Sequence, residues 1–108
     1  MFVGAGIIKI NIPYSRTLKD KRKVIKSIIN SIQSRYNISI SEVASQDNTS
    51  VGEIGFSMVS SDKNYINSLF DKILNFINEN YDIVVINEDY EIMKYWLKAE
   101  GWRWKNVW

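Results

Sequence analysis

Residues 7–36, IIKINIPYSRTLKDKRKVIKSIINSIQSRY, decide the fold because they join a strand, a stop and an amphipathic helix. Isoleucines alternate with Lys9 and Asn11 at the start of this stretch. A period of two is typical of a half-buried strand, which we predict over residues 2–12. Pro13 ends the strand, since proline cannot donate to a strand ladder.

The helix that follows is predicted over residues 18–36. Its apolar side chains recur at the helical period and fall on one side of the helix. Ser15 or Thr17 is expected to cap its N-terminus through a side-chain oxygen. Asn37 is expected to take the left-handed conformation that commonly ends a helix.

The rest of the chain predicts three more strands and one more helix. These are a strand over 38–44 with a bulge near Ser41–Glu42, a strand carrying Ile54, Phe56 and Met58, a helix from about 61 to 80, and a strand over 82–92. The order β-α-β-β-α-β is that of a ferredoxin-like α+β fold. Right-handed crossovers place both helices on one face of a four-stranded antiparallel sheet.

The other face of this sheet is predicted to be open and too apolar to remain in water. Alternation turns one set of side chains toward the helices: Ile8, Ile10, Ile12, Ile54, Phe56 and Met58. It turns a second set toward the open face: Val3, Ala5, Ile7, Gly55, Ser57, Val59 and alternate residues of 83–86. We therefore expect a second subunit or the C-terminal tail to cover the open face.

The composition excludes several kinds of catalytic site. The 108 residues are enough for one domain and contain neither Cys nor His. Disulfides, thiol or Ser–His nucleophiles and Cys- or His-ligated metals are therefore absent. No glycine-rich phosphate loop is present, and no apolar run is long enough to span a bilayer. We predict no cofactor, no metal, no catalytic residue and no membrane span.

Positive charge gathers in the first part of the chain. Residues 1–41 carry eight cations and one anion, whereas residues 42–93 carry two cations and ten anions. Lys19, Arg22, Lys23 and Lys26 lie at i, i+3, i+4 and i+7, and Arg16 precedes them, so they predict one basic stripe. Such a stripe is suited to nucleic-acid phosphates, and the alternative is an ordinary solvated helix face.

Lys21 is predicted to play a different part from its neighbours. On the helical wheel it falls near the apolar side, close to the sheet. We expect it either to extend its ammonium to the surface along the apolar side chains or to pair with an acid on the neighbouring strand, such as Glu42.

Residues 94–108 form an extension that is rich in tryptophan, beyond a domain predicted over residues 1–93. All four tryptophans of the chain lie here, interleaved with Lys94, Lys98, Arg103 and Lys105. Aromatic rings with cations suit contacts with nucleic acids or membrane surfaces. We favour packing of these large rings on the domain or on a partner subunit.

Several segments resemble the YlxP-like family of small bacterial proteins. Residues 17–22, TLKDKR, resemble its SLKEKR-type signature, and residues 37–43, NISISEV, resemble its N-V-S-x-A-E-[VI] segment. The resemblance implies a ferredoxin-like fold. Its association with translation genes implies a cytoplasmic role near RNA or the ribosome.

Three functional hypotheses follow. The first is a non-enzymatic cytoplasmic protein that binds RNA or ribosomal particles through Arg16, Lys19, Arg22, Lys23 and Lys26. The second is a homodimeric interaction module that uses the open sheet face and the tryptophan-rich tail. The third is a phosphate-ester or acyl-phosphate site near Arg16.

Overall fold

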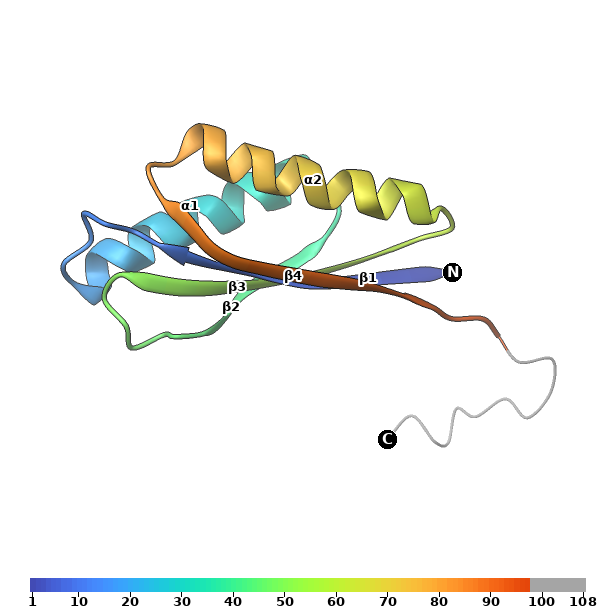
Figure 1. The fold of residues 1–108 in the computed structure, drawn as a ribbon, viewed down its shortest axis with the longest axis horizontal. Coiled ribbons are helices and arrows are strands. Elements are labelled where there is room, and N and C mark those ends of the chain that lie inside the picture. The colour runs from blue at the N-terminus through green and yellow to red at the C-terminus, as the bar shows by residue number, and fades with distance from the viewer. Residues whose placement is uncertain (98–108) are drawn as a thin grey trace.

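The computed structural model describes residues 1–97 as one sheet covered on one side by two helices (Figure 1). Its elements are β1 (Phe2–Asn11), α1 (Leu18–Arg35), β2 (Ser39–Ala44), β3 (Val51–Ser60), α2 (Lys63–Asn80) and β4 (Val84–Lys94). The strand order is β2-β3-β1-β4, and all neighbours are antiparallel. This confirms the predicted βαββαβ order.

The register places β1 in the middle of the sheet, between β3 and β4. Ile8 lies opposite Ile54 on one side and Glu88 on the other. The register shifts between Glu42 and Ala44, so the bulge of β2 is at Val43, slightly beyond the predicted Ser41–Glu42. A second shift, beside Lys9 and Ile10, was not predicted.

Both helices begin at a residue whose side chain caps them. Thr17 Oγ1 accepts a hydrogen bond from the Asp20 amide at 3.1 Å, so Thr17 rather than Ser15 caps α1. Asp62 caps α2 in the same way. The left-handed Asn37 was a wrong prediction. Helix α1 ends at Arg35, its C-cap Tyr36 has extended backbone, and Ser45 is the only non-glycine residue with positive φ in the described part.

The core lies between the sheet and the helices. Every side chain that was predicted to face the helices is buried there, including Ile54 and Phe56. Phe70 of α2 packs between Phe56 and Tyr90, with ring centroids 5.5 and 4.0 Å away. Gly6 makes room for this group, since a Cβ at that position would lie 2.7 Å from the Phe56 ring. The core thus fixes α1 and α2 on the same side and leaves the other face of the sheet uncovered by the described residues.

The sheet continues slightly beyond the predicted domain end at residue 93. Lys94 belongs to β4, and the Tyr95 amide donates to Met1 O at 2.8 Å. Trp96 packs edge-on against Phe2. The remainder of the tryptophan-rich extension, residues 98–108, lies outside the described residues.

Candidate functional site

Lys21 is a buried structural cation, as its position on the helical wheel predicted. Its side chain is 0% exposed, and Nζ lies 3.2 Å from Glu42 Oε2. Nζ also donates to the backbone oxygens of Ser45 at 2.6 Å and Val51 at 3.0 Å, with Gln46 O farther away at 3.4 Å. Glu42 Oε2 is buried without a well-directed hydrogen bond, so its contact with Lys21 is chiefly electrostatic. Lys21 therefore ties α1 to β2 and to the loop between β2 and β3.

The five predicted binding residues are all exposed, in contrast to Lys21. Arg16 lies in the β1–α1 connection, and the other four, Lys19, Arg22, Lys23 and Lys26, lie on α1. Among residues 1–97 the Lys21–Glu42 contact is the only ion pair, so none of the five has a carboxylate partner there. From residue 19 to residue 26 the stripe extends about 10 Å along the helix. Along the axis of a DNA duplex, where each strand carries one charge per about 3.4 Å, that length spans roughly three phosphates of one strand.

Asp20 is the one acid within this stripe, and it closes the start of the helix. Its carboxylate accepts a hydrogen bond from the Arg16 amide at 3.3 Å. This bond, then the Thr17 hydroxyl and more weakly the nearby Lys23 ammonium, lower the pKa of Asp20 below its ordinary value. Its charge also suits the positive end of the helix dipole. Asp20 thus satisfies the helix N-terminus and is not ion-paired with the exposed cations.

Phe56, the aromatic residue of β3, cannot stack on a nucleic-acid base. Phe56 is buried and faces Phe70, as its place in the strand alternation predicted. Any nucleic acid at α1 would consequently meet cations rather than a platform of rings on the sheet.

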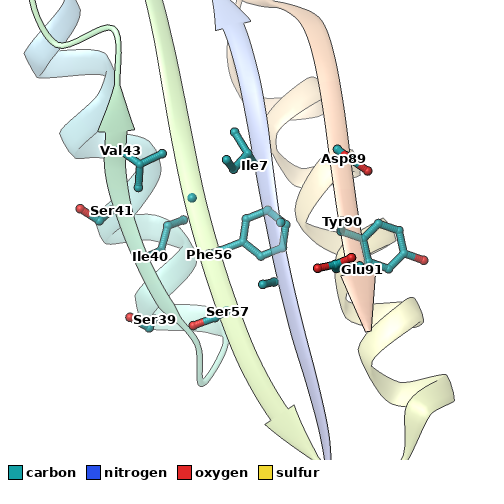
Figure 2. A pocket seen from close by; sticks show the side chains of 13 residues that line it. Ile7, Ser39, Ile40, Ser41, Val43, Phe56, Ser57, Asp89, Tyr90 and Glu91 are labelled. Carbon is teal, nitrogen blue, oxygen red and sulfur yellow. The ribbon is translucent and has the colours of Figure 1, made fainter. Parts of the chain in front are cut away.

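The open sheet face forms the second candidate surface, and the predicted residues lie on it. Ile7 is 47% exposed and Val59 61% exposed. Figure 2 shows a shallow hollow here that reaches across all four strands. Its two acidic residues, Asp89 and Glu91, were not predicted. Alternation continued from Val84 would have turned Glu88 and Tyr90 to this face, because the register shift beside Lys9 moves the count by one residue.

Metal-binding clusters and membrane-spanning helices were also sought within residues 1–97. No group of three or more acidic side chains in this part of the chain is placed to hold a metal ion. Neither α1 nor α2 combines the length and apolar character that crossing a bilayer requires.

Comparison with known proteins identifies the family. Residues 3–90 match the family described as "Protein of unknown function (DUF503)". The chain belongs to this family. It is 36% identical over 62 residues to the uncharacterized protein YlxP of Bacillus subtilis (strain 168), and the match covers 57% of this chain and 67% of that protein. The predicted membership of a YlxP-like family is confirmed.

Solved structures support the fold of this DUF503 protein. The designed ferredoxin-fold protein LFR1 1 superposes with a TM-score of 0.52 at 14% identity, covering 95% of this chain and 97% of the design. The designed protein Foldit4 superposes with a TM-score of 0.51 at 17% identity, covering 88% of this chain and 99% of that one. At such identities the likeness concerns the fold alone, and it confirms the ferredoxin-like architecture.

Proposed function

We propose that this DUF503 protein is a non-enzymatic cytoplasmic protein that binds RNA, including RNA in ribosomal particles, through the phosphate backbone. The binding surface is the basic stripe of Arg16, Lys19, Arg22, Lys23 and Lys26. The observation that carries the proposal is that all five cations are exposed and lack a carboxylate partner among residues 1–97. Lys21 and Arg35 on the same helix do have partners, since Arg35 lies 4.5 Å from the centre of the Phe76 ring.

The chemistry of the stripe favours phosphate contacts over base recognition. Phosphate contacts position a protein on nucleic acid and carry no sequence information directly. Each phosphate that is neutralised releases counterions, so affinity falls as the salt concentration rises. We therefore expect binding that depends strongly on salt and weakly on sequence.

No catalytic step is part of this proposal. The whole chain lacks His and Cys, the side chains that most often act as general base or thiol nucleophile. The alternative of a phosphate-ester site at Arg16 predicts hydrolysis of a phosphate ester that is abolished in Arg16→Ala. Such an activity would replace the proposal made here.

The first experiment measures the binding of purified full-length protein to ribosomal RNA and to ribosomal subunits at two salt concentrations. The variant Lys19→Ala/Arg22→Ala/Lys23→Ala/Lys26→Ala should lose most of the affinity. For every phosphate that the variant no longer neutralises, the slope of log affinity against log salt should become shallower by about 0.7 to 0.9. Its circular dichroism and unfolding midpoint should remain close to those of the wild type, because the four side chains are exposed.

A matched pair of double variants separates the stripe from general charge. Lys19→Ala/Lys23→Ala removes two cations of α1, and Lys63→Ala/Lys72→Ala removes two exposed cations of α2. Both variants have the same net charge. The proposal requires weaker RNA binding in the α1 variant only. Equal reductions of affinity in both, or no binding by the wild type at low salt, would make the stripe a solvated helix face.

A further inference from the structure

The hollow on the open sheet face has a floor of small side chains. It measures about 620 Å³ and lies on the side of the sheet that the helices do not cover (Figure 2). Ala5, Gly55 and Ser57 line it on the two central strands, β1 and β3, where larger residues would fill it. Ile7 and Val43 stand beside them and are 47% and 48% exposed. A large apolar side chain could enter this hollow without displacing the strands.

The charge of the hollow indicates what kind of occupant it suits. The only charged residues that line it are Asp89 and Glu91, both exposed on β4. An occupant that combines apolar rings with positive charge would complement it. A second copy of the same face would instead bring two more carboxylates against these two, which is unfavourable.

Residues 98–108, KAEGWRWKNVW, have this combination of properties. They include three tryptophans, three cations and one acid. Residues 95–97 leave β4 beside the start of β1, where Tyr95 and Met1 exchange backbone hydrogen bonds, and this described part of the chain runs toward the side of the sheet away from the helices (Figure 1). From Tyr95 back to the level of Ile7 is about six strand residues, or roughly 20 Å. Eleven extended residues can span about 36 Å, so the segment is long enough to return.

We infer that residues 98–108 dock on the open sheet face of their own chain, with a tryptophan ring in the hollow and a cation beside Asp89 and Glu91. The segment would cover the apolar side chains of Ile7 and Val59 that the described residues leave exposed. This inference is independent of RNA binding, because α1 lies on the opposite side of the sheet. It makes the tail an integral part of the domain.

NMR on the full-length protein tests the inference directly. We expect nuclear Overhauser effects between the indole protons of Trp102, Trp104 or Trp108 and the methyl groups of Ala5 and Ile7. A sample that mixes isotope-labelled and unlabelled protein shows whether these effects arise within one molecule. Effects within one molecule support the inference. Effects between molecules would overturn it in favour of a second copy, and their absence would also overturn it.

A pair of charge reversals tests the role of the two carboxylates. Asp89→Lys/Glu91→Lys should lower the equilibrium constant for docking of residues 98–108 by roughly 1.4- to 5-fold for each exposed ion pair that is removed. Asp71→Lys/Glu79→Lys changes the same charge on exposed positions of α2 and should leave the nuclear Overhauser effects at full strength. Unchanged effects in the β4 variant would contradict the inference. Unchanged methyl signals of Ile28 and Ile77 would show that the core of each variant is folded.

Discussion

Lys21 and Lys23 lie two residues apart on α1, yet their surroundings are opposite. Lys21 is fully buried against Glu42 and backbone oxygens, whereas Lys23 is exposed without a carboxylate partner among residues 1–97. The difference arises because two helical residues point about 200° apart around the axis. It shows that the run of charges over residues 19–26 contains two kinds of cation, one structural and one available for binding.

The largest expected effect comes from removing the buried member of the pair. Lys21→Met leaves the Glu42 carboxylate and the Ser45 and Val51 oxygens without the ammonium. Breaking a buried ion pair by removing one partner costs about 3–5 kcal/mol, and the partial exposure of Glu42 places the expectation at the lower end. Urea unfolding measures the change.

The control for this change is Lys23→Met, with the same chemistry on the exposed side of the helix. It should alter the free energy of unfolding by no more than about 0.5 kcal/mol. If Lys21→Met and Lys23→Met had equal free energies of unfolding, Lys21 would not be a structural lysine distinct from the exposed Lys23.

A smaller effect on the free energy of unfolding is expected at the start of α1. Thr17→Ala removes the hydroxyl that accepts from the Asp20 amide and should cost about 1 kcal/mol. Thr17→Ser keeps an oxygen at the same position and should recover most of that stability. Thermal unfolding of the two variants checks whether the cap supports the basic stripe. A Thr17→Ala variant as stable as the wild type would show that the cap is not needed.

The smallest effect concerns the pH dependence of Asp20. Its folded-state pKa is lowered, chiefly by the hydrogen bond from the Arg16 amide. The stability it contributes is therefore present above its unfolded pKa, near 3.9, and is lost as the pH falls through the lower folded value. A carbon-detected NMR titration should show Asp20 titrating below the ordinary value for an aspartate, about 3.9. Asp20→Asn should flatten this part of the stability profile, and an unchanged profile would contradict the assignment.

The fold was predictable because its elements have regular patterns. The alternation around Lys9 and the helical period from Leu18 onward identified the first strand and helix, and the wheel placed Lys21 on the side of the helix close to the sheet. The bulges were harder, since the extra residue at Val43 depends on pairing with β3, which no local pattern records.

The candidate site was predictable only in part. The spacing of Lys19 and Lys23 identified the stripe, but their lack of acidic neighbours depends on how distant segments pack. The carbonyl oxygens that hold Lys21 belong to Ser45, Gln46 and Val51, and backbone oxygens leave no signal in residue identity. The hollow beside Asp89 likewise depends on the sheet register.

The pairing of β1 with β4 has a consequence for how the chain folds during synthesis. Phe2 lies opposite Lys94, so one edge of the central strand waits until β4, the last of the four strands in chain order, has been made. At about 5–20 residues per second, the interval between finishing β1 and finishing β4 is roughly 4–17 s. During this time the apolar strand FVGAGIIKIN has an unpaired edge of the kind that promotes aggregation. The nascent chain is therefore most vulnerable before β4 emerges, and chaperones that shield exposed strands would act in that interval.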